Sequence, residues 1–339
     1  MEPPSAPRPT LQGSVTASRG DALSTRPAVG RLAPSPTGHL HLGHARSFLL
    51  AWWHARSRGA RLLLRFEDLD VERADPSHVV DAQRDLEWLG IDWDGAPTSQ
   101  SAGIERLMEH AEELHRRGLA YPCVCTRGDI RTAQAAPHGL LGESRYPGTC
   151  RGRYSSLGHA RRESGRHPGL RFVVPAGERV VPDAFVGPFP CDPEREVGDF
   201  LITRRDGSPA YQLAVVVDDL LGGVTEVVRG DDLLHSAARQ MLLLEAFGAA
   251  LPEYHHVPLV CDAHGRRLAK REQDLSLREL REAKVDGRAV VEWAARCSGF
   301  GAVERPRASE LVSAFEMAKV PRAPVRLHPE DVERIRAAR

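Results

Sequence analysis

Two histidines close together in the chain, His41 and His44, have the residue type and spacing to bind phosphate. They end the segment PSPTGHLHLGH, which follows a predicted strand at residues 30–33 and opens a predicted helix at residues 42–57. Imidazole N–H groups can donate hydrogen bonds to phosphate oxygens, a helix start favours anions, and Gly43 lets a nucleotide approach the backbone. Taken alone, the segment fits a histidine-rich turn without a ligand equally well.

A cationic segment far downstream is the second candidate for phosphate chemistry. It reads RRLAKR over residues 266–271 and follows a turn at residues 262–265. Lys270 is one of only three lysines among 46 basic residues, which favours a site that needs a compact ammonium. Such a loop can neutralise a triphosphate as it reacts, although an exposed basic loop without function gives the same pattern. The chain contains neither a G-x-x-x-x-G-K-[ST] loop nor a G-x-G-x-x-G turn.

Three of the six cysteines, Cys123, Cys125 and Cys150, are clustered in the sequence. Residues 1–28 lack the apolar core of a secretory signal, so we expect a cytoplasmic, reducing location, where clustered cysteines favour a metal over a disulfide. Three thiolates and one further ligand satisfy tetrahedral zinc. C-x-C is tighter than the usual C-x-x-C spacing, and free structural cysteines are the alternative.

The composition is that of a globular protein. Of the 339 residues, 41% are hydrophobic, and no run reaches the roughly 20 apolar residues that a membrane helix needs. The 46 basic and 46 acidic residues cancel, which argues against a non-specific nucleic-acid coat, so any RNA contact must come from local patches. No extended apolar interface stripe is evident, and we therefore expect a monomer.

Predicted strands and helices alternate in the order that is typical of a doubly wound α/β fold. A compact apolar strand is predicted at residues 61–66, followed by amphipathic helices at 78–89 and 103–117. Residues 120–170 interrupt the pattern with many Gly, Pro and Arg residues and are predicted to be an insertion. Further strands are predicted at residues 170–174, 200–203, 213–217, 224–228 and 256–260, with a helix at 233–247.

The histidine and lysine segments, taken together with three motifs between them and the residues that lead into the histidine segment, resemble the class I glutamyl-tRNA synthetase family. The resemblance covers roughly residues 30–275, and the motifs occur in family order. They are RLAPSPTG (31–38), HLGH (41–44), RFEDLD (65–70), YQLAVVVDD (211–219), VRGDDL (228–233) and RLAKR (267–271). The family typically has Lys and Ser where this chain has Arg267 and Ala269, while Lys270 is retained.

By this resemblance the chain activates glutamate with ATP and Mg²⁺. Glutamate carries two carboxylates and one ammonium, so a specific pocket needs cationic or donor groups and one anion. The resemblance assigns L-glutamate binding to Arg31, Leu32, Ala33, Pro34, Ser35, Glu67, Tyr211 and Arg229, and catalysis and ATP binding to His41, Gly43, His44 and Lys270. Glu67 is the expected ammonium partner, and Arg31 and Arg229 pair the carboxylates in an order that the sequence leaves open.

Within the family, the cysteine spacing and the chain length resemble the short members called glutamyl-Q tRNA(Asp) synthetases. In those, Tyr146 would be the fourth ligand of one Zn²⁺ per chain, with His138 as the alternative. Only 68 residues follow Arg271, too few for a helical anticodon-binding region. The resemblance implies tRNA-independent activation of glutamate and its transfer to the queuosine base of tRNA(Asp). A basic stretch of seven arginines between Arg145 and Arg171 either grips RNA phosphates or is a plain solvated surface.

The expected division of the chain has five parts. They are a disordered extension at 1–28, the first half of a Rossmann-type catalytic domain at 29–119, a zinc-binding insertion at 120–170, the second half with the lysine loop at 171–275, and a short helical tail at 276–339. The extension is rich in Pro, Ser and Arg, cannot bury enough surface to offset the entropy of ordering, and could alternatively mimic a transit peptide.

Three other functions compete with this one. They are a conventional glutamyl- or glutaminyl-tRNA synthetase, another nucleotidylyltransferase that shares His-x-Gly-His, and a non-catalytic paralogue that binds RNA or protein. The joint presence of Glu67, Tyr211, Arg229 and the lysine loop argues against the second. The intact Arg31, His44, Glu67 and Lys270 argue against the third.

Overall fold

The computed structural model describes residues 27–70, 72–133, 145–266, 268 and 275–338. Some residues singled out above lie outside this part of the chain. They are most of the expected N-terminal extension (1–26), the alternative zinc ligand His138, and Arg267, Ala269, Lys270 and Arg271 of the lysine loop.

Five parallel strands lie at the centre of the molecule. β1 (Val29–Leu32) pairs with β2 (Arg61–Phe66), which pairs with β3 (Thr98–Ser99), while β9 (Glu226–Gly230) pairs with β10 (Glu253–Val257). The strands at β1, β2 and β9 were all expected from apolar runs of strand length. β2 and β3 lie on one side of β1, and β9 and β10 lie on its other side.

The two strand groups meet between β1 and β9. Val29 N donates to Thr225 Oγ1 at 2.9 Å, and Thr225 N donates to Val29 O at 2.9 Å. Both bonds lie at the beginnings of the strands, so the carboxyl ends of β1 and β9 lie side by side at the opposite edge. In open α/β sheets ligands bind at the carboxyl edge where the strand order reverses, which places the ligand site of this fold here.

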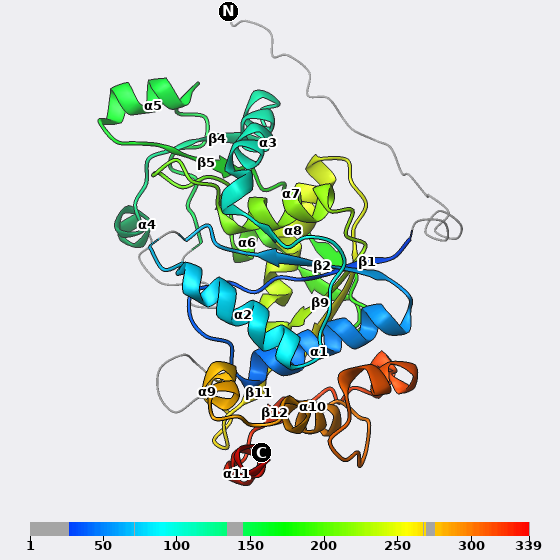
Figure 1. The fold of residues 1–339 in the computed structure, drawn as a ribbon. Coiled ribbons are helices and arrows are strands. Elements are labelled where there is room, and N and C mark those ends of the chain that lie inside the picture. The colour runs from blue at the N-terminus through cyan, green and yellow to red at the C-terminus, as the bar shows by residue number, and fades with distance from the viewer. Residues whose placement is uncertain (1–26, 71, 134–144, 267, 269–274, 339) are drawn as a thin grey trace, which may run out of the picture.

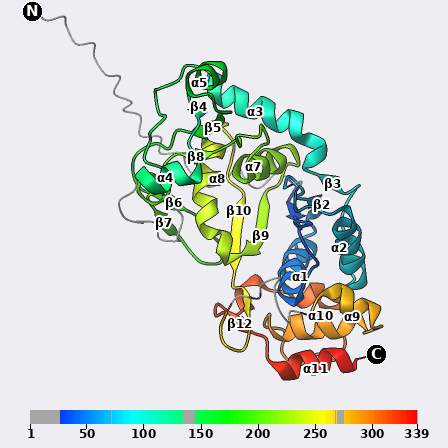
Figure 2. The same cartoon turned by 90° about the vertical axis from the view of Figure 1, so that its left-hand side faces the viewer.

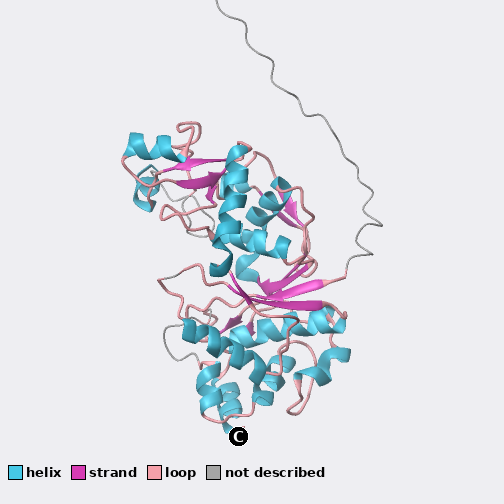
Figure 3. Ribbon diagram, turned by 45° about the horizontal axis from the view of Figure 1, so that its top comes forward, coloured by secondary structure: helices cyan, strands magenta, loops and turns pink. Residues whose placement is uncertain are grey.

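Helices cover both faces of the sheet, as a doubly wound fold requires (Figures 1 and 3). α1 (Leu42–Ser57) packs against β1, β2 and β9 on one face, with α2 (Pro76–Trp88) beside it. α3 (Ile104–Arg116), α7 (Tyr211–Leu221) and α8 (Leu234–Ala246) cover the other face. The short 3₁₀ turns Ser101–Gly103 and Asp231–Leu233 lead into α3 and α8.

The strand predicted at Leu213–Val217 is wrong, because this segment forms the middle of α7. All five of its residues are buried, and α7 packs against both α8 and α3. A helix buried around most of its circumference reads as a continuous apolar run, just as a fully buried strand does. The β-branched valines fitted either structure, and burial between two helices decided in favour of the helix.

A second, antiparallel sheet joins the expected insertion (120–170) to the segment that follows it. Its strands are β4 (Ala120–Cys123), β5 (Gly169–Phe172) and β8 (Phe200–Leu201). Phe172 and Phe200 from this sheet share one apolar core with residues of α3, α7 and α8. The smaller elements of this region are α4 (Arg127–Ala133), α5 (Leu157–Ser164), the paired strands β6 (Arg179–Val181) and β7 (Phe189–Cys191), and α6 (Pro193–Glu196).

The strand predicted at 256–260 is divided in two. β10 ends at Val257 and β11 (Val260–Cys261) begins after Pro258, which has no N–H to donate to a ladder. β11 pairs with β12 (Val325–Arg326) from the end of the chain. Figure 2 shows these short strands close to the C-terminal helices.

The C-terminal region packs against α1 and shares its core. It contains α9 (Leu277–Glu282), α10 (Gly287–Arg296), α11 (Pro329–Ala337) and the 3₁₀ segments Ala308–Ala314 and Met317–Lys319. Trp53 of α1 is fully buried, and its Nε1 donates to Ala308 O at 2.9 Å. Trp293 of α10 is buried in the same cluster. None of the helices in the described part of the chain has the length and apolar character needed to cross a bilayer.

Candidate active site

Three of the predicted glutamate-binding residues lie at the carboxyl ends of neighbouring strands. Arg31 is the third residue of β1, Glu67 directly follows β2, and Arg229 is the fourth residue of β9. Arg31 and Arg229 are each only 6% exposed, and the Glu67 side chain is 8% exposed. Charged groups this deeply buried must be paired or await a ligand.

Two residues that were not predicted to be part of the site hold these charges in place. Arg65 Nη1 donates to Asp219 Oδ1 at 2.6 Å, and Arg65 Nη2 donates to Glu67 Oε1 at 3.3 Å. Arg31 Nε lies 3.6 Å from Asp219 Oδ2. Asp219 lies near the end of α7, and Arg31 and Arg65 lie on β1 and β2. The segment that was predicted to be a strand and is the helix α7 therefore supplies the carboxylate that contacts both guanidinium groups. Both residues lie inside motifs that the sequence singled out, but their pairing is purely tertiary.

The pKa values of the two buried carboxylates, Asp219 and Glu67, are shifted in opposite directions. For Asp219, burial raises the pKa, but the guanidinium groups of Arg65 and Arg31 outweigh it and leave the pKa below its ordinary value. For Glu67, burial dominates over the same two arginines, and nearby Asp219 adds to it, so the pKa is raised. Asp219 is therefore the structural anion, whereas the Glu67 carboxylate lacks sufficient compensation and gains most from an incoming cation.

Arg229 is oriented by a buried relay that sequence reasoning missed. Its Nε donates to His256 Nε2 at 2.9 Å, and His256 Nδ1 donates to Asp183 Oδ2 at 2.6 Å. The side chains of His256 and Asp183 are both 0% exposed, and Asp183 also accepts from the backbone N–H groups of Phe185 and Val186. Among the described residues, Arg229 Nη1 is buried without a hydrogen-bond partner, which leaves one donor for a ligand.

Replacing His256 should separate the two halves of this relay. In His256→Asn the amide takes the place of Nδ1 and keeps the bond to Asp183 but cannot reach Arg229. In His256→Gln the amide oxygen takes the place of Nε2 and still accepts from Arg229. Since one hydrogen bond to a charged group contributes about 1.5–3 kcal/mol, we expect the KM for glutamate to rise roughly tenfold or more in His256→Asn only. Equal KM values for the two variants would contradict the relay, and circular dichroism melts check that both fold.

Tyr211 belongs to the same cluster. It is the first residue of α7, and its pKa is raised by burial first and then by the charge of Glu67, against the opposing influence of Arg229 and Arg31. The structure thus brings together Arg31, Glu67, Tyr211 and Arg229, as the sequence predicted.

The other four predicted glutamate-binding residues lie between Arg31 and the histidine turn. The Leu32 side chain is in the apolar core, so Leu32 can offer a ligand only its backbone. Pro34 is buried, and its carbonyl accepts from Glu67 N at 3.0 Å, which ties this segment to the end of β2. Ala33 is half-buried and Ser35 is exposed.

The histidine turn forms the start of α1, and both imidazoles serve as caps. Gly43 N donates to His41 Nδ1 at 3.1 Å, and His41 N donates to His44 Nδ1 at 3.2 Å. The two ring centroids are 3.7 Å apart. Because both Nδ1 atoms accept, the neutral rings carry their protons on Nε2, the donor that a phosphate oxygen needs. The hydrogen bonds that cap the start of α1 therefore also fix the tautomer of each ring.

Gly43 has a second role that the sequence did not suggest. A Cβ placed there would lie 2.9 Å from His41 Cε1, so any side chain displaces the His41 ring. We expect Gly43→Ala to raise the KM for ATP about tenfold, the cost of one lost charge-assisted hydrogen bond, while the KM for glutamate changes little. Steady-state ATP–pyrophosphate exchange measures both constants. Gly158→Ala in α5 is the matched control, since its new Cβ would meet the flexible end of the Arg162 side chain at 3.3 Å and Ser156 Oγ at 4.0 Å, an ordinary contact. Unchanged ATP binding in Gly43→Ala would contradict this role.

The described ends of the lysine loop lie beside the histidine turn. Leu268 N donates to Val260 O at 3.4 Å, and the Cβ of Val260 lies 3.6 Å from where a Gly43 Cβ would be. On the other side, Leu277 N donates to Leu40 O at 2.8 Å, and Ser276 forms an antiparallel bridge with His41. Lys270 itself lies outside the described residues.

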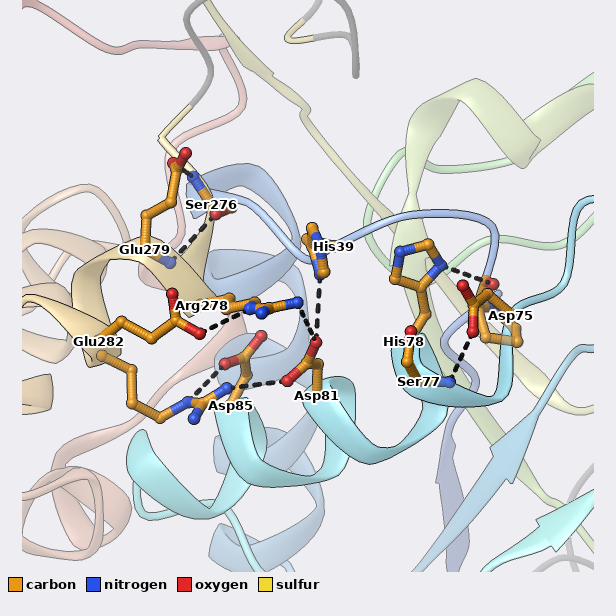
Figure 4. A network of polar contacts seen from close by, with 12 residues as sticks. His39, Asp75, Ser77, His78, Asp81, Asp85, Ser276, Arg278, Glu279 and Glu282 are labelled. Atoms are coloured by element: carbon orange, nitrogen blue, oxygen red, sulfur yellow. Dashed lines mark hydrogen bonds and ion pairs between the residues drawn. The ribbon is translucent and has the colours of Figure 1, made fainter.

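A network of ion pairs fixes the helix that follows the loop (Figure 4). Arg278 and Arg281 of α9 lie 3.1 and 3.2 Å from the carboxylate of Asp81 on α2, and Arg281 also lies 3.0 Å from Asp85. His39 lies 3.5 Å from the same Asp81 carboxylate. One acidic helix thus connects the segment before the histidine turn to the segment after the lysine loop.

The predicted zinc ligands are gathered in the insertion. Cys123, Cys125 and Cys150 offer sulfur atoms that all lie within 4.8 Å of one another. Cys125 Sγ lies 3.5 Å from Cys150 Sγ, and Tyr146 Oη lies 3.4 Å from Cys123 Sγ and 3.6 Å from Cys125 Sγ. Tetrahedral zinc with bonds of about 2.3 Å to sulfur and 2.0 Å to oxygen requires separations of about 3.8 Å between sulfurs and about 3.5 Å between sulfur and oxygen. The four donors fit that geometry.

Hydrogen-bond donors and one cation lie around this cluster, while burial raises the pKa of the Tyr146 phenol and, to about 12, that of the Cys125 thiol. Cys150 N donates to Tyr146 Oη at 2.9 Å, so the phenol oxygen acts as an acceptor. Arg171 Nε donates to Cys123 Sγ at 3.2 Å, and its guanidinium carbon lies 3.8 Å from the centre of the Tyr146 ring. Arg171 is buried, and its Nη1 donates to Asp199 O at 2.8 Å. Such neighbours orient metal ligands and offset the excess negative charge of thiolates and phenolate.

Comparisons with known proteins identify the family. A family model for the catalytic domain of class I tRNA synthetases (E and Q) matches residues 28–322. The chain is 44% identical over 315 residues to the glutamyl-Q tRNA(Asp) synthetase of Symbiobacterium thermophilum, covering 89% of this chain and 97% of that one. It is 37% identical to glutamate–tRNA ligase 1 of Acidithiobacillus ferrooxidans, covering 88% of this chain and 63% of that one.

A solved structure has the same fold. A glutamate tRNA ligase from Elizabethkingia meningosepticum, crystallised with its amino acid, superposes with a TM-score of 0.76 at 24% identity, over 91% of this chain and 68% of that chain. The match to the family model spans most of the chain, and the resemblance first drawn from six motifs is thereby confirmed. The chain belongs to the class I tRNA synthetases of the glutamate and glutamine family.

Proposed function

We propose that this protein activates L-glutamate with ATP, without tRNA, and transfers the glutamyl group to the queuosine base of tRNA(Asp). The observation that carries the first half is the buried charge constellation at the carboxyl edge of the sheet. Arg31 and Arg229 offer two cationic groups, and Glu67 is a carboxylate that burial leaves under-compensated. This set complements a ligand with two carboxylates and one ammonium.

We assign a role to each charged group of the pocket. The glutamate ammonium pairs with Glu67, whose raised pKa falls again when a cation arrives. Arg229 Nη1, buried and without a partner among the described residues, receives one carboxylate. Arg31 is held only loosely by Asp219, at 3.6 Å, and is available to the other. A site built to pair every charge rejects analogues that lack one, because a buried group is then left unpaired.

ATP binding is assigned to the histidine turn and the lysine loop. The Nε2 protons of His41 and His44 suit phosphate oxygens, and the start of α1 adds its dipole. The role of Lys270, which lies outside the described residues, is carried over from the family resemblance. The glutamate carboxylate attacks the α-phosphorus, pyrophosphate leaves, and Lys270 stabilises the leaving charge. ATP enters with Mg²⁺, and the protein mainly positions reactants and stabilises charge.

The cysteine cluster is proposed to hold one Zn²⁺ through Cys123, Cys125, Tyr146 and Cys150. The ion would join the end of β4 to the segment that leads into α5 and would be structural, since four protein ligands leave no open position. We keep the five-part division of the chain, with this insertion at 120–170, as part of the proposal.

Removing one zinc ligand should release the metal and loosen the insertion. We expect the purified protein to carry one zinc per chain by inductively coupled plasma mass spectrometry, and Cys125→Ser to carry little. A loss of about 3 kcal/mol would lower the melting temperature by roughly 4–5 °C in a chain of this size. Cys261→Ser is the matched control, because Cys261 lies on β11, outside the cluster. Metal-free protein with normal stability and activity would contradict the site.

The acceptor is inferred from relatives and from the surface of the insertion. Relatives called glutamyl-Q tRNA(Asp) synthetase are 43–46% identical to this chain over most of its length. Of the seven arginines in the insertion, Arg171 is buried and Arg166 pairs with Asp129, whereas Arg161 and Arg162 are exposed on α5. These two are placed to contact RNA phosphates, and their contribution should weaken with salt.

Two assays test the function in order. Glutamate-dependent ATP–pyrophosphate exchange in the absence of tRNA is expected to proceed, and its absence would remove the first half of the proposal. Glutamylation is then compared on tRNA(Asp) with and without queuosine and on tRNA(Glu). Charging of queuosine-containing tRNA(Asp) alone is expected. Charging of tRNA(Glu) but not tRNA(Asp) would instead identify a conventional glutamyl-tRNA synthetase.

A further inference from the structure

A second group of metal-binding side chains lies on the α1 face of the sheet, at the beginnings of β9 and β10. His54 is in the last turn of α1, Glu253 begins β10, and His255 follows two residues later. One donor atom from each of these three residues lies within 4.8 Å of the other two. The glutamate pocket is at the opposite, carboxyl edge, so the activation chemistry does not use this cluster.

The two imidazoles are buried and face each other. His54 is 5% exposed and His255 is 4% exposed, with ring centroids 4.5 Å apart and planes inclined by 58°. His255 Nε2 lies 2.9 Å from Glu253 Oε1. This contact is a hydrogen bond, and a separation of about 3.4 Å, between adjacent ligands of a tetrahedral ion with bonds of about 2.1 Å, requires the two side chains to move apart by only about 0.5 Å.

A fourth residue of the cluster, Glu226, contacts His54 without a well-formed hydrogen bond. Glu226 Oε2 and His54 Nε2 form an ion pair at 3.3 Å, and among the described residues neither atom makes a hydrogen bond of good geometry. Glu226 is 4% exposed, and both atoms are fully shielded from solvent. Buried polar atoms are normally hydrogen-bonded, so this pair has unused binding capacity. A cation beside the two atoms would use it.

The charge of the cluster also suits a cation. Glu226 and Glu253 carry two negative charges, and the Arg58 guanidinium supplies one positive charge, 2.8 Å from Glu226 and 3.9 Å from Glu253. With neutral imidazoles the cluster therefore has one negative charge in excess. Glu253 is 46% exposed at its side chain, so one carboxylate of the cluster is accessible to an ion in solvent.

We propose that His54, His255 and Glu253, with Glu226 beside them, form a binding site for a divalent transition-metal ion. Two imidazoles and a carboxylate select zinc, nickel or cobalt over magnesium or calcium, which prefer all-oxygen sites. Because the ligands come from α1 and β10, and Glu226 begins β9, a bound ion fastens the end of α1 to the sheet. The site is distinct from the cysteine cluster and independent of the proposed function.

Metal titration of the full-length protein tests the site. After removal of metal with a chelator, wild-type protein is expected to bind two equivalents of Zn²⁺ by equilibrium dialysis. Glu253→Gln is expected to bind the second equivalent at least tenfold more weakly and to keep the first. Since Glu253 is half-exposed, this variant should fold normally. His167→Asn, which changes an exposed histidine elsewhere, is the matched control and should bind two equivalents.

Cobalt identifies the ligands of each equivalent. Co²⁺ in the cysteine cluster gives intense sulfur-to-metal charge-transfer absorption, whereas Co²⁺ at the histidine site gives only weak d–d bands. We expect the weak bands to disappear in His255→Asn and Glu253→Gln and the charge-transfer bands to persist. Zinc binding of identical stoichiometry and affinity in wild type and Glu253→Gln would overturn the proposal and leave a metal-free ion-pair cluster. Pyrophosphate exchange should be unchanged in Glu253→Gln, so this result and a failure of the proposed function are separable.

Discussion

Replacing Arg229 with alanine is expected to reduce kcat/KM for glutamate in pyrophosphate exchange by at least about 100-fold. Arg229 is buried, fixed by His256, and keeps one guanidinium nitrogen without a partner among the described residues. Removing one member of a buried, hydrogen-bonded charge pair costs about 2–5 kcal/mol, and 2.7 kcal/mol corresponds to 100-fold. The division of the loss also identifies the carboxylate: a rise in KM alone indicates the carboxylate that does not react, whereas a fall in kcat indicates the one that attacks ATP.

The control for this variant replaces an arginine that is exposed, whereas Arg229 is buried. Arg195 on α6 has a side chain that is 85% exposed and forms an ion pair with neighbouring Asp192. Arg195→Ala should leave the tRNA-independent exchange within about twofold of wild type, because exposed ion pairs contribute little. If Arg229→Ala retains glutamate-dependent exchange at the level of this control, the pocket described here does not bind glutamate.

The second large effect is expected for Glu67→Gln, which should lower kcat/KM for glutamate by about 100-fold above neutral pH. The variant keeps the shape and an acceptor for Arg65 but loses the negative charge that pairs with the ammonium. Leaving that ammonium unpaired in a buried pocket costs several kcal/mol. Pyrophosphate exchange across a range of glutamate concentrations measures the change. Exchange that survives unchanged in Glu67→Gln would exclude Glu67 as the ammonium partner.

The pKa of Glu67 adds a pH signature to this prediction. In the ligand-free pocket the pKa of Glu67 lies above the ordinary value of 4.5, because burial outweighs the attraction of Arg65 and Arg31. Glutamate binding therefore weakens as the pH falls through this raised pKa, since a protonated Glu67 cannot pair with the ammonium. In Glu67→Gln this acidic decline of kcat/KM should be absent. A decline that persists unchanged would assign it to another group.

The same shift predicts that Glu67→Gln stabilises the ligand-free protein. A carboxyl whose pKa is higher in the folded than in the unfolded state favours folding when protonated, and this advantage is lost as the pH rises through the folded pKa. At neutral pH the buried charge therefore costs stability, and an amide removes that cost. We expect a higher melting temperature without glutamate and a smaller rise on adding glutamate. A melting temperature that falls without ligand would show that Glu67 serves the fold.

The sequence anticipated most elements that carry the site, and its main error is instructive. The strands β1, β2 and β9 and the helices α1, α2, α3 and α8 appear at their predicted places because their apolar spacing and turn residues are local signals. The segment at 213–217 was misassigned because a run of buried valines has no period. Its true structure depends on α3 and α8, which enclose it on two sides.

The sequence by itself determined which functional groups are available for binding and catalysis. They are two imidazoles at a helix start, one lysine in an arginine-rich chain, clustered thiols, and acidic and basic residues at strand ends. Only the tertiary structure decided which charges meet, since Arg65 and Asp219 are 154 residues apart and Asp183 and His256 are 73 apart. Pairing at such distances follows from packing of the whole fold, and residue spacing does not encode it. Burial, also a tertiary property, then made Asp219 the structural anion and left Glu67 for the ligand.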